Sequence, residues 1–108
     1  MNSEIHVVGL GVASGMRLSL PAEQALRSAH TVIGSERQLE LARGLVDCDS
    51  ASLQVLPKLS ELKSLIDDLP GNIAILASGD PLYYGIGRWL SRQFDASRLQ
   101  FHPAVSSV

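Results

Sequence analysis

The feature of this chain that most constrains its fold is the unbroken apolar run Ile73-Ala74-Ile75-Leu76-Ala77. Turn-forming residues bound the run, with Pro70-Gly71 before it and Ser78-Gly79 after it. A short run of this kind, which lacks polar residues at alternate positions, is typical of a strand buried on both faces. Such strands occur in parallel sheets whose two faces are covered by helices.

The rest of the chain alternates between strand and helix patterns. Short β-branched or alternating runs predict further strands at residues 5–8, 31–33, 53–56 and 99–102. The first of these is expected to end at Val8, because Gly9-Leu10-Gly11 breaks the pattern. Strands that alternate with helices predict an α/β domain, with a parallel-type sheet and right-handed crossovers.

Local signals predict where the helices begin and end. Pro21 opens the first helix, which has a face of small residues at Ala22, Ala25, Leu26 and Ala29. The Ser-x-x-Gln pattern from Ser35 to Gln38 is a capping box, so a second helix should begin at Glu36, with Leu39, Ala42 and Val46 on its apolar face. Leucines at helical spacing predict a third helix over 59–69, and Ile86, Leu90 and Phe94 mark a fourth.

Composition narrows the class of protein. The 108 residues suffice for one small domain, and a 45% hydrophobic content predicts a globular chain. Nine basic and eleven acidic residues are spread along the chain, which argues against a nucleic-acid-binding surface. Cys48, the single cysteine, excludes an internal disulfide and fits a reducing compartment. No signal peptide or apolar run of roughly 20 residues is present, so we expect a cytoplasmic protein without membrane association.

Three segments that follow predicted strands are candidates for ligand binding. They are the glycine loop that begins at Gly9, the Ser-Gly-Asp-Pro loop at 78–81, and Ser106-Ser107 after Pro103. The carboxyl ends of parallel strands meet at one edge of a sheet, which is where ligands bind in open α/β folds. The alternative for the loop at 78–81 is a tight strand-to-helix turn, with Asp80 only capping the helix.

The sequence shows no arrangement of residues that is typical of acid–base catalysis or metal binding. His6, His30 and His102 are far apart and lack the spacing of metal ligands, and no Ser-His-Asp order or carboxylate pair stands out. We therefore expect no catalytic side chain and no metal, and a site that binds and positions its ligands.

The glycine loop Val8-Gly9-Leu10-Gly11, the loop at 78–81 and Pro103-Ala104-Val105-Ser106-Ser107, in this order, make the chain resemble the tetrapyrrole methylases. The segments 32–38 and 82–87 are most similar to the branch that methylates C5 of a corrin precursor, precorrin-6Y or cobalt-precorrin-7, in cobalamin biosynthesis. The resemblance spans nearly all 108 residues. It implies a methyltransferase that uses S-adenosylmethionine (SAM), a tetrapyrrole substrate, and a class III methyltransferase fold.

The resemblance also implies roles for individual residues. The cofactor-binding ones would be Val12, through its backbone, together with Ser78, Gly79, Asp80, Tyr83, Ser106 and Ser107. Gly9 and Gly11 would face the tetrapyrrole, and Arg17 or Arg37 could hold its carboxylates. Many family members have proline where this chain has Val12, which puts the shape of the first loop in doubt.

The family enzymes are about twice this length or more and place SAM between two α/β domains. Residues 1–108 would then be the N-terminal subdomain, with the second subdomain missing and the full-length protein a homodimer. This agrees with the abrupt end of the sequence at Val108.

Other functions remain open on the residues alone. Gly9, Gly11 and Gly15, with Glu36 as the ribose-binding acid, are an imperfect dinucleotide fingerprint and leave an NAD-type dehydrogenase half-domain as one alternative. A non-catalytic α/β interaction domain is a second. A tetrapyrrole methylase with another target carbon is a third.

Overall fold

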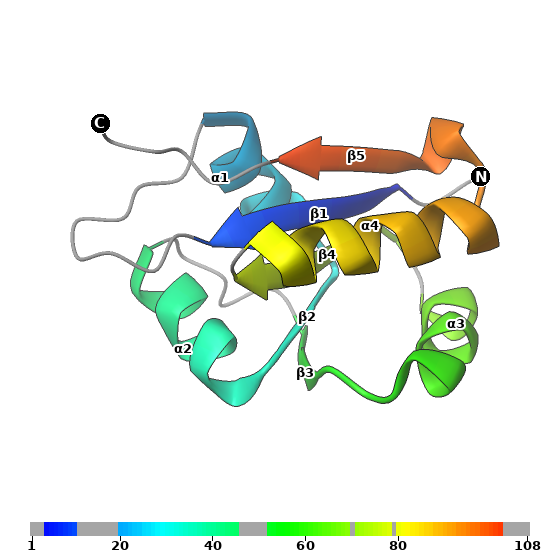
Figure 1. Ribbon diagram of the computed structural model, residues 1–108. Helices are drawn as coiled ribbons and strands as arrows, with labels where there is room; N and C mark the ends of the chain where they lie inside the picture. The colour runs from blue at the N-terminus through cyan, green and yellow to red at the C-terminus, as the bar shows by residue number, and fades with distance from the viewer. Residues whose placement is uncertain (1–3, 11–19, 46–51, 70, 79, 103–108) are drawn as a thin grey trace.

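The computed structural model describes residues 4–10, 20–45, 52–69, 71–78 and 80–102 (Figure 1). The strands are β1 (Ile5–Leu10), β2 (Thr31–Gly34), β3 (Ser52–Val55), β4 (Ile73–Ser78) and β5 (Leu99–His102). The helices are α1 (Leu20–Ser28), α2 (Glu36–Leu45), α3 (Leu59–Asp68) and α4 (Asp80–Gln93), and a short 3-10 helix, η1 (Ala96–Arg98), precedes β5. Strands and helices alternate along the chain, which confirms the predicted α/β class.

The strands form one parallel sheet in the order β3-β2-β4-β1-β5. The strand predicted from the apolar run, β4, lies at the centre, where Ile75 pairs with Val7 of β1 on one side and with Ile33 of β2 on the other. Strands β3 and β5 are the edges, which accounts for their exposed positions, including Val55 and Phe101.

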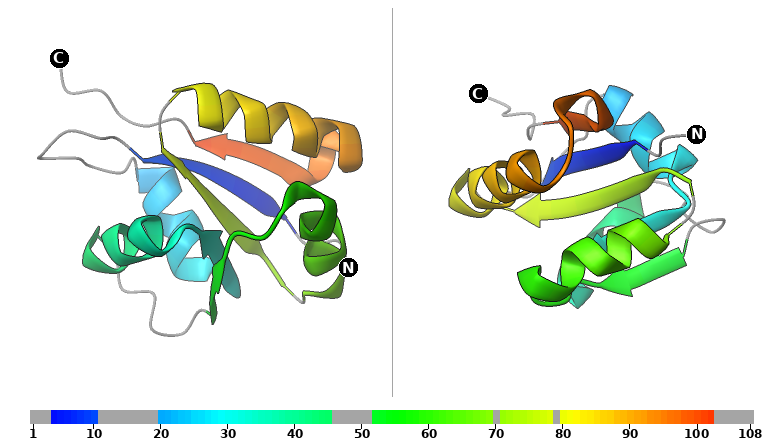
Figure 2. Two further views of the ribbon diagram at one scale, coloured as in Figure 1. Left: turned by 60° about the horizontal axis from the view of Figure 1, so that its bottom comes forward. Right: turned by 90° about the vertical axis from the view of Figure 1, so that its right-hand side faces the viewer.

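Helices cover both faces of the sheet, as Figure 2 shows from two directions. Successive residues of β4 alternate between the faces. Ala74 and Leu76 pack in a cluster with the helices α1 and α2, and Ile73 and Ile75 pack in a second cluster with α3 and α4. The central strand is therefore buried on both sides, as its uninterrupted apolar sequence predicts.

The helix faces agree with the sequence pattern. The predicted inner face of α1 and the residue after it (Ala22, Ala25, Leu26 and Ala29) are all at most 4% exposed. The three alanines have small side chains, which lets this helix lie close to the sheet. On α2, Leu39 and Ala42 are buried as predicted. Val46 lies outside the described residues.

The capping box at the start of α2 is present. The Ser35 N–H donates to Gln38 Oε1 at 2.8 Å, and the Gln38 N–H donates to Ser35 Oγ at 3.2 Å. These reciprocal bonds satisfy two backbone donors that the first turn of a helix leaves without partners. They also explain why α2 begins at Glu36.

Replacing Ser35 by alanine is expected to lower the free energy of unfolding by about 1 kcal/mol, because it removes the acceptor for the Gln38 N–H. Urea denaturation followed by circular dichroism measures the change. Ser60→Ala is the matched control, because Ser60 is exposed in the first turn of α3, whose N-cap Lys58 makes no side-chain cap hydrogen bond. Equal losses in the two variants would contradict a capping role for Ser35.

The first strand is longer than expected. The first strand does not end at Val8, because Gly9 pairs with Ala77 and Leu10 with Ser78 of β4. The adjacent strand continues the parallel ladder over these residues, so pairing overrides the weak strand preference of glycine.

Candidate functional site

The carboxyl ends of β1, β4 and β5 lie together at one edge of the sheet, where all three arrows of Figure 1 point to the same side. Leu10, the last residue of β1, pairs with Ser78, the last residue of β4. His102, the last residue of β5, pairs with Val8 on the other side of β1. The three segments predicted to bind a ligand therefore leave the sheet from adjacent strands.

The connections from these strands diverge. Helix α1 follows β1 on one face of the sheet, and the chain then continues to β2, beyond β4. Helix α4 follows β4 on the opposite face, and the chain then continues to β5, beyond β1. Neighbouring strands whose connections run to opposite sides create a crevice beyond their carboxyl ends, the usual ligand site of open α/β sheets.

The structure places four of the predicted site residues at this edge. Gly9 is a buried residue of β1, beside Ala77 of β4. Ser78 ends β4, Asp80 begins α4, and Tyr83 is the fourth residue of that helix. Ser78 is thus a strand residue, where the sequence suggested a loop.

The other predicted site residues lie outside the described residues. They are Gly11, Val12, Gly79, Ser106 and Ser107, together with Arg17 of the suggested substrate-binding pair. Of that pair, Arg37 is the exposed second residue of α2.

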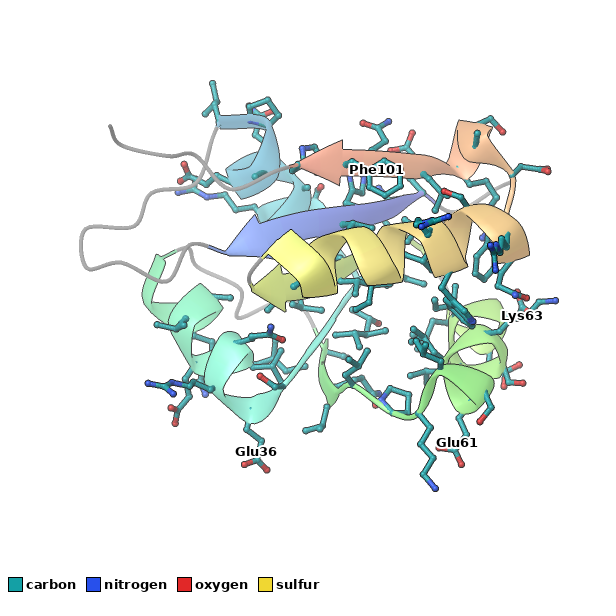
Figure 3. All side chains as sticks on the ribbon, viewed as in Figure 1. Glu36, Glu61, Lys63 and Phe101 are labelled. Carbon is teal, nitrogen blue, oxygen red and sulfur yellow. The ribbon has the colours of Figure 1, made fainter. Side chains whose placement is uncertain are left out.

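Helix α4 is held over the edge strand by a close approach at Gly87. A Cβ atom at this buried position would lie 3.0 Å from Cε1 of Phe101 on β5, so glycine leaves room for the ring. Figure 3 labels Phe101 on β5, beside α4. Ile86 and Leu90 point into the core from the same helix. This packing fixes the direction of α4, and with it the position of its first residue, Asp80.

The strand order argues against the dinucleotide alternative. In a dinucleotide-binding sheet the second strand is the direct neighbour of the first, which brings its acidic residue to the same ligand as the glycine loop. Here β4 lies between β1 and β2. Glu36, the candidate ribose-binding acid, is exposed at the start of α2, and its side chain points away from the sheet (Figure 3). Strand β4 thus separates the strand that precedes the glycine loop from the strand that precedes Glu36.

Two histidines that are far apart in the sequence contact each other beside this edge. His6 Nδ1 of β1 lies 3.0 Å from His102 Nε2 of β5, and both residues are buried. Burial, followed by the repulsion of a charged His6, lowers the pKa of His102. Only the pairing of β1 with β5 could have revealed this contact, since the residues are 96 positions apart.

Two classes of feature are not found in the described residues. Within them, no group of three or more His, Cys, Asp or Glu side chains is arranged to hold a metal ion. None of the helices in the described ranges is long and apolar enough to cross a membrane.

Comparison with known proteins gives one family. Residues 4–108 match the family model described as Tetrapyrrole (Corrin/Porphyrin) Methylases. No match was found among solved structures.

Several curated proteins are similar to the chain over most of its length. A precorrin-6Y C(5,15)-methyltransferase [decarboxylating] of Mycobacterium tuberculosis is 36% identical over 104 residues, which cover 96% of this chain and 26% of that protein. A cobalt-precorrin-7 C(5)-methyltransferase of Salmonella typhimurium is 32% identical over 110 residues, covering 96% of this chain and 51% of that protein. A probable cobalt-precorrin-7 C(5)-methyltransferase of Methanocaldococcus jannaschii is 35% identical over 85 residues, covering 76% and 39%. The chain thus spans between about a quarter and a half of the length of these relatives.

Proposed function

Because this chain belongs to the tetrapyrrole (corrin/porphyrin) methylase family, we propose that it forms part of an enzyme that methylates a corrin precursor. The reaction proposed is SAM-dependent methylation at C5 of precorrin-6Y or cobalt-precorrin-7, in cobalamin biosynthesis. Relatives named for each of these two substrates match the chain, which supports the corrin class as a whole.

One structural observation carries the proposal. The carboxyl ends of β4, β1 and β5 are adjacent and in register, and the connections of β1 and β4 run to opposite faces. This arrangement is typical of ligand-binding α/β sheets, and the segments in which the family resemblance lies follow these strand ends in the sequence.

The residues of this edge suit a cofactor with a charged amino-acid end and a ribose. We assign Ser78 at the end of β4, Asp80 and Tyr83 in the first residues of α4, and Gly79 between them in the sequence to the methionine and ribose portions. The carboxylate of Asp80 would accept hydrogen bonds from hydroxyl or ammonium groups, and backbone N–H groups of the helix start would donate to anionic oxygens. Val12, Ser106 and Ser107 would complete the cofactor site from the neighbouring loops, and Gly9 and Gly11 would face the tetrapyrrole.

Bound SAM supplies an already activated methyl group, so the protein need not provide a nucleophile or a strong acid. The proposed task of this domain is to hold the methyl donor in line with the attacking carbon. Positioning of this kind can contribute an effective molarity on the order of 10⁵ M or more. The proposal therefore assigns no catalytic side chain to residues 1–108.

The length of the relatives supports a two-part enzyme. The match covers 51% of the Salmonella typhimurium protein, which leaves room for a second domain of similar size. We propose that residues 1–108 are the N-terminal subdomain, that the second subdomain closes the cofactor site, and that the whole protein is a homodimer.

The test is calorimetric titration of the full polypeptide that carries this chain with S-adenosylhomocysteine, the product form of the cofactor, and with NAD in parallel. We expect micromolar affinity for S-adenosylhomocysteine and no heat from NAD. Binding of NAD alone would overturn the proposal in favour of a dehydrogenase. Binding of neither compound would leave a scaffold without a cofactor site.

A further inference from the structure

His6 and His102 form a buried contact between the first and last strands. The two residues are 7% and 9% exposed, and their rings are stacked with centroids 5.2 Å apart and an angle of 20° between the planes. His6 Nδ1 lies 3.0 Å from His102 Nε2, and His6 Nε2 lies 3.2 Å from Oε2 of Glu4. The chain Glu4–His6–His102 thus runs from the half-exposed start of β1 to the end of β5.

The geometry of these three linked side chains limits the number of protons that they can hold. A hydrogen bond between two ring nitrogens needs one N–H and one free lone pair. In the neutral pair, His102 Nε2–H donates to His6 Nδ1, while His6 Nε2–H donates to Glu4. One added proton is accommodated when His6 becomes an imidazolium, which donates to the Glu4 carboxylate and to a lone pair on His102 Nε2. A second added proton would direct two N–H groups at each other across 3.0 Å.

No other charge in the described residues packed around the pair can offset a second proton. On the face of the sheet that holds both rings, β4 presents Ala74 and Leu76. The charged residues of the covering helix α1, Glu23 and Arg27, bond to each other at 2.7 Å. Strand β5 carries no charged residue besides His102 itself. Glu4 is therefore the one anion among the described residues in contact with the pair, and it contacts only His6.

We propose that His6 and His102 form a clamp that admits one proton and is opened by a second. With at most one added proton, the clamp holds the carboxyl end of β5 against β1. Because β5 is an edge strand and β1 is its single partner strand in the described sheet, loss of this contact frees the end of β5.

The direction of the pH effect follows from the surroundings of His102. Burial first, and a charged His6 second, lower the pKa of this residue from its usual 6.5. The folded state resists the proton that the unfolded or opened state accepts below about pH 6.5. The contribution of the clamp to the stability of the folded state is therefore fully present above that pH. It is lost as the pH falls through the lowered pKa of His102.

The test requires no variant at first. Nuclear magnetic resonance of the ring nitrogens of the unmodified protein reports the protonation and tautomer of each histidine between pH 8 and 4. We expect His102 to take up its proton at a lower pH than a histidine with the ordinary pKa of 6.5. Amide exchange, corrected for its intrinsic pH dependence, should show the opening constant of β5 rising by up to about tenfold per pH unit below pH 6.5. The other edge strand, β3, should show no such rise.

Matched variants then separate the clamp from general acid destabilisation. His102→Gln places an amide near the position of Nε2 and cannot titrate, so β5 exchange should lose its pH dependence. His30→Gln changes an exposed histidine outside the pair and should keep the pH dependence of the unmodified protein. Should His102→Gln fail to fold, His6→Gln removes the other titrating ring and serves the same comparison.

Two results would overturn the proposal. One is protonation of both rings near pH 6.5 without any rise in β5 exchange. The other is unchanged pH dependence in His102→Gln. None of these measurements uses SAM, so a protein that fails to bind S-adenosylhomocysteine can still show the clamp, and the two proposals fail separately.

Discussion

Replacing Asp80 by alanine is expected to weaken the binding of S-adenosylhomocysteine by roughly 10- to 100-fold. Asp80 begins α4 directly beyond the carboxyl end of β4, which is the neighbour of β1 in the sheet, with β5 on the other side of β1. Hydrogen bonds to a charged group are worth about 1.5–3 kcal/mol each, and 1.4 kcal/mol is a tenfold change in affinity. Stability should change by less than about 1 kcal/mol, the usual value of an acidic residue at a helix start. Calorimetry and urea denaturation measure the two effects.

Glu36→Ala is the matched control for this prediction. Glu36 is also an acidic residue that begins a helix after a parallel strand, but β4 separates its strand from β1. Affinity for S-adenosylhomocysteine should be unchanged in this variant. If the two variants lose affinity equally, the ligand does not lie at the turn from β4 into α4. If Asp80→Ala changes stability alone, Asp80 only caps the helix, as the interaction-domain alternative holds.

Replacing Ile75 by alanine is expected to cost about 2–5 kcal/mol of folding free energy. Ile75 is fully buried at the centre of β4, with Val7 and Ile33 as its register partners and the α3–α4 cluster above it. The substitution removes apolar area and leaves a cavity that the close-packed neighbours can fill only in part. A domain of this kind is stable by about 5–15 kcal/mol, so the loss is a large share of the total. Urea denaturation gives the midpoint and the slope from which the loss is derived.

Two controls frame this result. Ile75→Val removes one methylene and should cost about 0.5–1.5 kcal/mol. Val55→Ala lies on the edge strand β3 at a position that is 56% exposed and should cost less than about 1 kcal/mol. A larger loss for Val55→Ala than for Ile75→Ala would contradict the placement of β4 at the centre of the sheet.

The elements that sequence reasoning predicted correctly are those with a local cause. The Ser-x-x-Gln pattern fixes the start of α2 through two bonds between residues three apart. The apolar run that forms β4 can be recognised without knowledge of its partners, because an uninterrupted apolar sequence indicates burial on both faces. The same holds for the small-residue face of α1.

The features that escaped prediction depend on partners distant in sequence. Glycine and leucine at 9 and 10 were expected to break β1, and only the ladder with β4 keeps them in the strand. The order of the sheet, with β4 between β1 and β2, follows from how the helices cover the two faces and not from any single segment. The contact between His6 and His102 exists because β1 and β5 are neighbours.

The candidate site is intermediate between these cases. Parallel strands in an α/β sheet place their carboxyl ends on one side, so the edge that holds Gly9, Ser78 and Asp80 could be predicted from the alternation of strands and helices. The order of the strands, and therefore which carboxyl ends are neighbours at that edge, could not be predicted. The assignments of Val12, Ser106 and Ser107 concern residues outside the described ranges and stay predictions.

The position of β1 between β4 and β5 also determines when the fold can form. Ile5 leaves the ribosome well before its register partners, Ile73 and Leu99. Until those residues have been synthesised, β1 lacks both of its partner strands, whereas β2 and β3 in the described sheet can already pair. Contacts this distant in sequence slow folding and leave the unpaired segment open to aggregation in the meantime. The sheet is therefore completed late and cooperatively, and a chain cut before β5 would leave β1 as an exposed edge.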